Sequence, residues 1–436
     1  MELVSILLML LVLFTLARIG NRVFEHFGIP GLIGEIIVGI IIANLTLTGD
    51  GSTLLDLLGV QLPGPGEDST STNYSILYAA AELGVIFLLF SVGLETRVSE
   101  LLSVGKSALL VAVLGVILPF VCGWAYIELT QSNFHHAMFL AAAMVATSVG
   151  ITARVIKDMH LMETHEAKII IGAAVIDDVL GMVVLAIVKG TAGSASVTIG
   201  SIVEVIVMAV AFVLAMIAAA MWLVPRIYTK WEAHEKKVEA KTGKPTQGFN
   251  ILVVALVACL FFAWLAETIG LAAIIGAFLA GMLFADHAWE TKLNEKVETL
   301  TTAFISFFFL NVGMQVDVAL ISSWNVIIMA VIVIIIAVIT KFVGCGLGAW
   351  LADRKIPKDS IKIIGVGMIP RGEVGIIVAS IGLNLIVDGS SALSSELYAV
   401  IVLMAVATTI IAPPLLARAF RKKYPEQFTI TAQDKI

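Results

Sequence analysis

Long apolar stretches alternate with short charged segments along the whole chain. Thirteen of these stretches approach or exceed the ~20 residues that a helix needs to cross a membrane. They cover residues 2–17, 31–48, 76–95, 107–128, 137–153, 169–188, 198–225, 249–267, 271–285, 300–316, 325–351, 363–386 and 395–417. The inside-outside alternation of a membrane β-barrel is absent. The pattern therefore predicts an all-α polytopic membrane protein with 13 transmembrane helices.

The composition agrees with a chain that is largely embedded in lipid. Hydrophobic residues make up 59% of it and charged residues 14%, whereas soluble domains have about 45–50% and ~25%. The net charge of −6 lies in the loops, and we expect no nucleic-acid partner. The cysteines Cys122, Cys259 and Cys345 have no metal or redox spacing, so we expect no cofactor. The first stretch lacks a basic start and a cleavage site, which indicates a helix rather than a removable signal.

The positively charged residues lie almost entirely on one side of this arrangement. Of the 27 Lys and Arg, 24 fall in segments that follow odd-numbered stretches, and Lys189 alone follows an even-numbered one. Because cytoplasmic loops are rich in Lys and Arg, the N-terminus is expected outside and the C-terminus in the cytoplasm. The two residues left over, Lys341 and Arg371, fall inside predicted helices. The expected location is the cell membrane, with the loop 48–73 outside and the charged segment 226–248 inside.

Two pairs of similar segments indicate an internal repeat. "IGEIIVGIIIAN" (33–44) resembles "IGAFLAGMLFAD" (275–286), and "FLLFSVGLE" (87–95) resembles "FFFLNVGMQ" (307–315). Both matches are seven helices apart. Because seven is odd, the two copies would enter the membrane from opposite sides. Such inverted repeats are typical of secondary transporters, whose sites lie near the membrane midplane between the copies.

The repeat divides the chain into parts of one transport unit. That unit is expected to cover residues 1–420. It contains a first repeat (1–188), a linker helix (198–225) and an inverted second repeat (249–417), and a cytoplasmic tail (421–436) follows it.

Two stretches that correspond in the repeat are interrupted. "AAAMVATSVGITARV" (141–155) carries Thr147 and Ser148 in mid-span, and "GVGMIPRGEVGIIVAS" (365–380) carries Pro370, which disfavours a continuous helix. Broken helices expose backbone groups, which membranes tolerate only where those groups line a polar cavity. We therefore predict two crossed, broken helices at the site. The alternative is that the hydroxyl groups bond within their own helix and that Pro370 makes a simple kink.

Five ionisable residues are expected deep in the membrane, namely Asp177, Asp178, Lys341, Arg371 and Glu373. One charge at the centre of a membrane helix costs at least about 2.5–3.5 kcal/mol, so such residues usually serve a function. Lys341 is too far from either end of its helix to reach the interface and needs a partner. Three acids against two bases leave one carboxylate in excess. That excess indicates a site for a cation or a proton.

The adjacent residues Asp177 and Asp178 suit exchange chemistry. Neighbours on a helix point ~100° apart, so one can pair with Lys341 while the other faces a cavity. Proximity and burial both favour the protonated form of a carboxylate, which lets H⁺ exchange with a metal cation. Oxygens of Asp178, Thr147 and Ser148 are hard ligands that suit a small alkali ion. A purely structural ion-pair network is the alternative.

These motifs resemble the cation:proton antiporter superfamily, specifically its paired-aspartate NapA-like sodium/proton antiporter branch. The resemblance covers nearly the whole chain. It rests on "TSVGITARV" (147–155), "IDDVLGMVVLA" (176–186), "TKFVGCGLG" (340–348) and "PRGEVG" (370–375). It implies a homodimer in which a core domain moves against a fixed dimerisation domain.

The resemblance also implies a role for each site residue. Asp178 would bind the ion and the proton, and Asp177, a second ligand of the Na⁺ ion, would pair with Lys341, as a salt bridge or a proton carrier. The two crossing helices would complete the site with Thr147 and Ser148 on the first and the charged pair Arg371 and Glu373 on the second.

The expected function is therefore exchange of Na⁺ or Li⁺ for protons by alternating access, electrogenic and not enzymatic. A K⁺/H⁺ or broad monovalent-cation antiporter is the alternative. It is less favoured because the related Kef-type potassium systems carry a nucleotide-binding domain, which is not seen after residue 420, and usually lack the first aspartate. A cation channel would not need an inverted repeat. An intramembrane aspartyl protease would need its two aspartates on different helices.

Overall fold

The computed structural model describes residues 2–27, 29–46, 52–62, 71–192, 199–219, 226, 251–288, 292–316, 318, 323–387 and 390–426. Residues 48–51 and 63–70 of the outer loop, nearly all of the cytoplasmic segment 226–248 and the tail beyond residue 426 lie outside these residues. The expectations for those segments therefore stay predictions.

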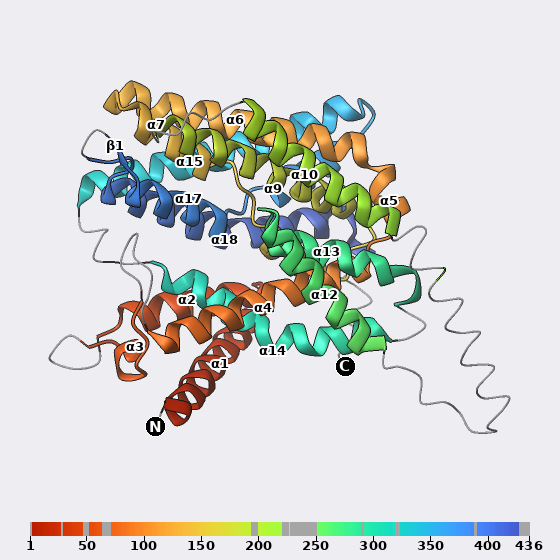
Figure 1. The fold of residues 1–436 in the computed structure, drawn as a ribbon, viewed down its shortest axis with the longest axis horizontal. Helices are drawn as coiled ribbons and strands as arrows, with labels where there is room; N and C mark the ends of the chain where they lie inside the picture. Colours follow the sequence, from red (N-terminus) through yellow and green to blue (C-terminus); the bar gives the residue numbers. More distant parts are fainter. Residues whose placement is uncertain are drawn as a thin grey trace.

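The described residues are mainly helical, which confirms the all-α expectation (Figure 1). The helices of the first half are α1 (Glu2–His26), α2 (Gly31–Asn44), α3 (Leu54–Leu57), α4 (Thr72–Leu94), α5 (Val98–Ser103), α6 (Gly105–Gln131), α7 (Phe134–Ala143), α8 (Val149–Asp158), α9 (His165–Ala192) and α10 (Ile199–Ala218). The second half contains α12 (Ile251–Thr268), α13 (Ala273–Phe284), η2 (Ala285–His287), α14 (Leu293–Met314), α15 (Trp324–Ala352), α16 (Lys358–Gly367), α17 (Glu373–Asn384) and α18 (Ser395–Lys423). Two short antiparallel strands, β1 (Ile386–Val387) and β2 (Ser390–Ser391), precede α18.

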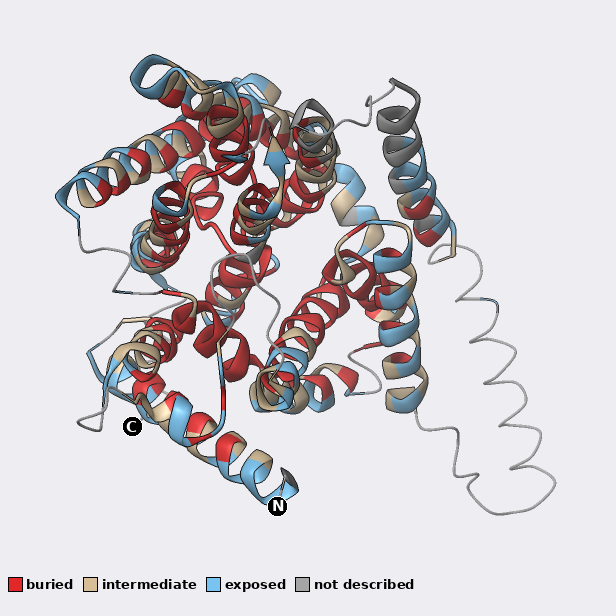
Figure 2. Ribbon diagram, turned by 60° about the vertical axis from the view of Figure 1, so that its left-hand side comes forward, coloured by how far each residue is buried: buried red, intermediate tan, exposed pale blue. Residues whose placement is uncertain are grey.

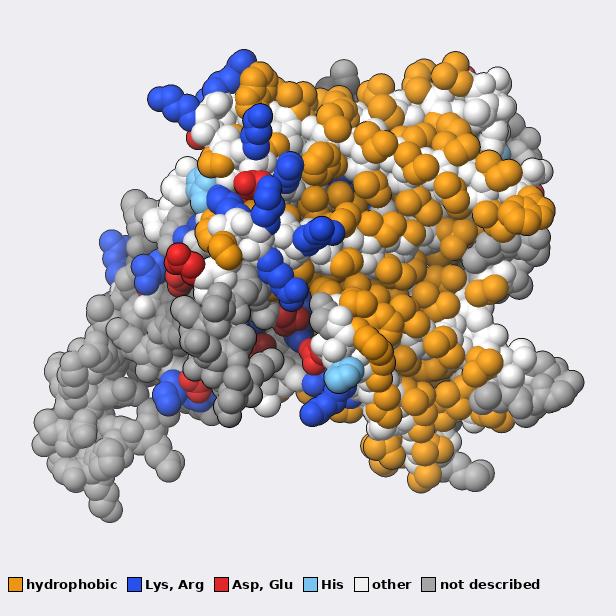
Figure 3. Space-filling view, turned by 180° about the vertical axis from the view of Figure 1, so that it is seen from behind, with side chains coloured by type: hydrophobic (Ala, Val, Ile, Leu, Met, Phe, Trp, Pro, Cys, Tyr) orange, Lys and Arg blue, Asp and Glu red, His pale blue; other side chains and the backbone are white. Residues whose placement is uncertain are grey.

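A helix or a pair of short helices overlaps each of the thirteen apolar stretches. Among the described residues, 7 helices are long and apolar enough to cross a membrane, and α2, α7, α13 and α17 are shorter apolar helices. The protein is therefore a multi-pass membrane protein, while the count of 13 crossings stays a prediction. Apolar side chains cover a broad face of the molecule, and Lys and Arg gather at one side of that face (Figure 3).

The helices form two groups, which Figure 1 shows as an upper and a lower layer. We call the lower group the panel, which consists of α1, α2, α4, α12, α13 and α14. We call the upper group the core, which consists of α6, α7, α8, α9, α15, α16, α17 and α18. Buried residues fill the interior of both groups, whereas α1 is exposed along much of its length (Figure 2).

Glycines allow two helix pairs of the panel to touch backbone to backbone. Gly39 of α2 meets Gly313 of α14, and Gly93 of α4 meets Gly281 of α13. A Cβ atom added to any of the four would lie only 2.1 to 2.3 Å from a carbonyl oxygen of the opposite helix. The four glycines occupy matching positions in the two pairs of similar segments. The contact between α2 and α14 therefore has the same geometry of glycine packing as the contact between α4 and α13.

Two helices of the core are broken, as the polar residues and Pro370 predict. The first break separates α7 from α8, and the second separates α16 from α17. The breaks meet, because the backbone N–H of Ser148 donates to the carbonyl oxygen of Pro370 over 2.8 Å. The hydroxyl group of Thr152 in α8 also donates to the carbonyl oxygen of Gly367 at the end of α16, over 2.6 Å. The two broken helices thus cross at their unwound segments.

Candidate functional site

Lys341 of α15 and Asp177 of α9 form an ion pair inside the core. The Nζ atom of Lys341 lies 2.9 Å from Oδ1 of Asp177, and both side chains are 0% exposed. Lys341 also donates to the carbonyl oxygens of Gly115 and Val145, over 2.9 and 2.7 Å. All three ammonium hydrogens therefore have acceptors. The partner that the position of Lys341 requires is present.

Asp177 also holds the first helix break in place. Its second carboxylate oxygen accepts a hydrogen bond from the backbone N–H of Thr147 over 2.9 Å. This N–H lies between α7 and α8, where no helical carbonyl is available to it. Val145, whose carbonyl oxygen accepts from Lys341, belongs to the same break. The ion pair therefore stabilises the unwound segment as well as joining α9 to α15.

Asp178, Thr147 and Ser148 lie beside this junction and are buried. Their exposed fractions are 7%, 3% and 7%. Asp178 follows Asp177 on α9, so its side chain points ~100° away around the helix, and it has interactions of its own. Among the described residues, the hydroxyl oxygen of Thr147 has no hydrogen-bond partner. A buried polar atom without a partner is costly, and a bound cation would supply one.

Arg371 lies in the second break and is completely buried. Two threonines of α18 hold its backbone, since its N–H donates to the hydroxyl group of Thr408 over 3.1 Å and its carbonyl oxygen accepts from Thr409 over 2.7 Å. Its three guanidinium nitrogens have no hydrogen-bond partner among the described residues. No described residue therefore fixes the guanidinium group by a hydrogen bond. The group lies close enough to Asp177 and Lys341 for their charges to interact.

Glu373 begins α17, one residue after Gly372. Its side chain lies outside the described part of the chain, so its role stays a prediction. Gly372 itself packs against Ser148, because a Cβ atom at that position would lie 2.7 Å from the hydroxyl oxygen of Ser148. The second break therefore restricts the space around one of the candidate oxygen ligands.

Several groups that build this site are not among the residues predicted from the sequence. The carbonyl oxygens of Gly115 and Val145 have no signal in the sequence, because every residue carries one. Thr408 and Thr409 do have a signal, since two adjacent hydroxyl groups in the middle of an apolar stretch are unusual. Their hydrogen bonds to the backbone of Arg371 cannot be predicted from the sequence, because they form only when α18 packs against the second break.

The chain is similar to a known family and to known proteins over nearly its whole length. The family model described as "Sodium/hydrogen exchanger, transmembrane" matches residues 9–422. The high-affinity Na⁺/H⁺ antiporter NhaS3 of Synechocystis sp. is 32% identical over 98% of this chain and 92% of its own length. The Na⁺/H⁺-K⁺ antiporter GerN of Bacillus cereus is 32% identical over 93% of this chain and 94% of its own.

A solved structure has the same fold. The sodium proton antiporter MjNhaP1 from Methanocaldococcus jannaschii, determined at pH 8, superimposes with a TM-score of 0.65. The match covers 96% of this chain and 97% of that one, at 16% sequence identity. At this identity the likeness shows the arrangement of the helices and not the ion that is carried.

Proposed function

Since the chain belongs to the transmembrane sodium/hydrogen exchanger family, we propose that it exchanges Na⁺ for protons at Asp178, Thr147 and Ser148. The protein is a monovalent cation:proton antiporter and not an enzyme. The observation that carries the proposal is the junction of Asp177, Lys341 and the first helix break. It places an acidic pair, a buried base and an unsatisfied hydroxyl oxygen in one place. A protease would need two aspartates from different helices, whereas here both lie on α9 and one is bound to Lys341.

The cation would be bound by oxygen atoms alone. Asp178 supplies a negative charge, and Thr147 and Ser148 supply neutral hydroxyl oxygens from the unwound segment. Hard oxygen ligands suit alkali ions. When the cation leaves, a proton on Asp178 replaces its charge, so the site is never left as a bare carboxylate in a region of low dielectric constant. Asp178 thus holds either the cation or a proton, so that binding of one releases the other.

The ion pair between Lys341 and Asp177 supports electrogenic transport. A cation that recruits Asp177 as a second carboxylate ligand removes the counter-charge from Lys341. A buried ammonium group without a counter-charge favours the loss of its proton. Asp178 and Lys341 would then each release one proton for each Na⁺ ion bound, and one net charge would move in every cycle.

Alternating access would come from movement of the core against the panel. The paired contacts of Gly39 with Gly313 and of Gly93 with Gly281 support an inverted repeat, because symmetry-related positions contact each other. They also favour the panel as the rigid part, since its helices touch through their backbones. The distribution of Lys and Arg supports an external N-terminus and a cytoplasmic C-terminus in the cell membrane.

A homodimer would be formed through the panel. Apolar side chains of α1 and α12 are exposed, among them Leu7 and Leu11 of α1 and Val257 and Trp264 of α12. The main packing contacts of both helices are with other helices of the panel. A second copy that covers them would fix the panel in the membrane while the core moves.

Proton flux in proteoliposomes tests the proposed cation. Purified protein is reconstituted with an imposed pH gradient, and Na⁺, Li⁺ or K⁺ is added separately. We expect Na⁺ and Li⁺ to dissipate the gradient at concentrations at least about tenfold lower than K⁺. Equal responses to all three would favour a broad monovalent-cation antiporter, and the relative GerN is itself named as a Na⁺/H⁺-K⁺ antiporter. No cation-dependent flux in any of them would contradict the proposal.

A further inference from the structure

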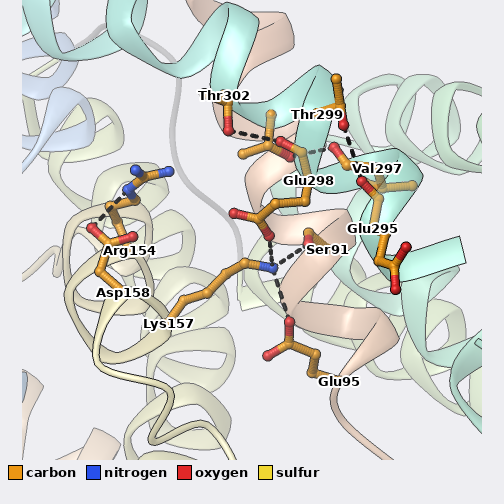
Figure 4. Close-up of polar contacts among 11 residues, drawn as sticks. Ser91, Glu95, Arg154, Lys157, Asp158, Glu295, Val297, Glu298, Thr299 and Thr302 are labelled. Carbon is orange, nitrogen blue, oxygen red and sulfur yellow. Dashed lines mark hydrogen bonds and ion pairs between the residues drawn. The ribbon is translucent and has the colours of Figure 1, made fainter. Parts of the chain in front are cut away.

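Lys157 connects the core to the panel through an ion pair (Figure 4). It lies in the last turn of α8, the helix that follows the first break. Its Nζ atom lies 2.9 Å from Oε1 of Glu95, at the end of α4, and 2.6 Å from Oε2 of Glu298 in α14. It also donates to the hydroxyl group of Ser91 in α4. One lysine of the core therefore has three acceptors, all of them in the panel.

This ion pair differs from the others that join described residues. Lys341–Asp177, Lys422–Asp359 and Lys423–Glu166 join helices of the core, and Arg154–Asp158 lies within α8. Arg18–Glu35 joins two panel helices, and Arg97–Asp286 joins the segments that follow α4 and α13. Lys157 alone, among these described pairs, spans the boundary across which the core has to move.

A second contact closes the same boundary nearer to the site. Gly150 of α8 lies between Thr147 and Lys157 along the chain, seven residues or about two helical turns from Lys157. A Cβ atom at Gly150 would lie 3.0 Å from Val85 of α4 and 3.9 Å from Phe308 of α14. Apolar packing therefore follows directly after the proposed site. The polar contacts of Lys157 lie farther from the site, at the end of α8.

The degree of burial makes the ion pair suitable for repeated opening. Lys157 is 7% exposed and Ser91 is completely buried, so the closed contact excludes most water. Glu95 and Glu298 are 22% and 43% exposed, respectively. Because the acids keep part of their hydration, separating the pair costs less than separating a fully buried one. The ion pair can therefore stabilise the state in which it is formed and still break repeatedly.

We propose that Lys157, Glu95 and Glu298 form a latch that keeps the cytoplasmic side of the transporter closed and opens once in each transport cycle. The proposal rests on the proposed function, which supplies the cytoplasmic orientation and the movement of the core. Opening separates α8 from α4 and α14, which uncovers the passage toward Thr147. Closing returns the ammonium group to its two carboxylates before the opposite side opens.

A chemical cross-link tests whether this boundary has to open. Lys157→Cys and Glu298→Cys are combined with Cys122→Ser, since Cys259 and Cys345 are buried and Cys122 is exposed. A short bis-thiosulfonate bridges the two new cysteines. We expect Na⁺-driven proton flux to fall by at least about tenfold and to return when a reductant cleaves the bridge.

A matched control places the same bridge inside the core. Lys422 of α18 pairs with Asp359 of α16 over 3.0 Å, so Lys422→Cys with Asp359→Cys gives a cross-link of similar length that does not cross the boundary. Exchange in this protein should stay within about twofold of its unbridged form. If bridging residues 157 and 298 leaves exchange unchanged as well, the boundary does not open there and the latch is wrong.

Neutral variants test whether the ion pair itself favours the closed state. Lys157→Met and, separately, Glu298→Gln are compared with Lys422→Met in inside-out vesicles, which present the cytoplasmic face to added Na⁺. Loss of the latch shifts the population toward the state open to the cytoplasm. The apparent KM for cytoplasmic Na⁺ should therefore fall about three- to tenfold in the first two variants and not in the control.

These outcomes separate the latch from the proposed function. Wild-type vesicles without any cation-coupled proton flux would contradict the function. Wild-type exchange with an unchanged cytoplasmic KM in the variants would contradict the latch alone. Glu298→Gln keeps the test decisive if Lys157→Met does not fold, because Glu298 lies at a more exposed position.

Discussion

The backbone N–H of Ser148 donates a hydrogen bond to the carbonyl oxygen of Pro370 over 2.8 Å, and this bond joins the two helix breaks of the core. Neither group has a helical partner, because each lies between two short helices. The bond therefore satisfies two backbone groups that the membrane could not hydrate. It also brings Ser148, and with it Thr147 and α8, to a fixed position beside the second break. The site and the latch at Lys157 consequently lie on one continuous structural element.

Asp178→Asn should abolish exchange. Asparagine has nearly the same shape as aspartate, but it carries no charge for the cation and takes up no proton. We expect Na⁺-driven proton flux in proteoliposomes to fall by at least about 100-fold, with a melting temperature close to that of the wild type. Asp359→Asn, at an exposed position of the core, serves as the control. Coupled exchange near the wild-type rate in Asp178→Asn would exclude Asp178 as the carrier.

Thr147→Ala and Ser148→Ala should weaken cation binding more than they slow transport. Both residues supply neutral oxygens and not the exchanged proton, so the apparent KM should rise about three- to tenfold while the maximal rate changes less. Thr147→Ala removes a hydroxyl oxygen that has no partner among the described residues, so little stability should be lost with it. Initial rates at increasing Na⁺ concentration measure both constants. An unchanged KM in both variants would place the cation elsewhere.

The packing of the panel predicts matched losses of stability at matched glycines. Gly39→Ala and Gly281→Ala each place a Cβ atom within 2.3 Å of a backbone oxygen, and such overpacking costs about 1–3 kcal/mol. Gly105→Ala is the control, because no atom lies within 4 Å of the added carbon. We expect a lower melting temperature in detergent for the first two variants and no loss for the third. A large difference between Gly39→Ala and Gly281→Ala would argue against the inverted repeat.

Glu166 gives the core a contribution to stability that depends on pH. Burial raises the pKa of Glu166, but hydrogen bonds from Lys423, Ser360 and Tyr424 outweigh burial and hold this pKa below its ordinary value of 4.5. A carboxyl group with a lowered pKa in the folded state stabilises the fold above pH 4.5. This contribution is lost as the pH falls through the folded-state pKa.

Glu166→Gln should therefore reduce the dependence of stability on acid pH. The melting temperature of the wild type should fall more steeply than that of the variant between about pH 5.5 and pH 3.5, because glutamine has no proton to gain. Glu163→Gln, at an exposed position just before α9, should keep the wild-type slope. Identical slopes in all three proteins would show that Glu166 is not responsible.

The sequence predicts the helices and the ion pair of the site better than it predicts the contacts between the two helix groups. Apolar length and Pro370 are local signals, so the helices and both breaks can be expected from short windows. Lys341 and Asp177 can be paired because few charges lie in mid-membrane. Lys157 gives no such signal, since it lies among ordinary loop charges. Its partner Glu95 is 62 residues away in the chain, and only the packing of α8 on α4 brings them together.

The charge that moves with each Na⁺ ion depends on the role of Lys341. Lys341 uses its three hydrogens on Asp177, Gly115 and Val145, so it is either a permanent strut or a proton carrier that is released when Asp177 binds the cation. A strut could be replaced by apolar packing at little cost, whereas a carrier must titrate. We therefore expect Lys341 to carry one proton and Asp178 the other.

Lys341→Gln distinguishes these two roles, because glutamine keeps the size and two hydrogen-bond donors but cannot exchange a proton. Charge movement on a solid-supported membrane after a Na⁺ jump is compared with proton flux for the wild type, Lys341→Gln and the surface control Lys422→Gln. As a carrier, Lys341 contributes the net charge of the cycle, which responds to membrane potential by about 2.3 kcal/mol per 100 mV. The variant should then show either no transport or exchange without net charge. If it moves the same charge per Na⁺ as the wild type, Lys341 is a strut and transport is electrogenic for another reason.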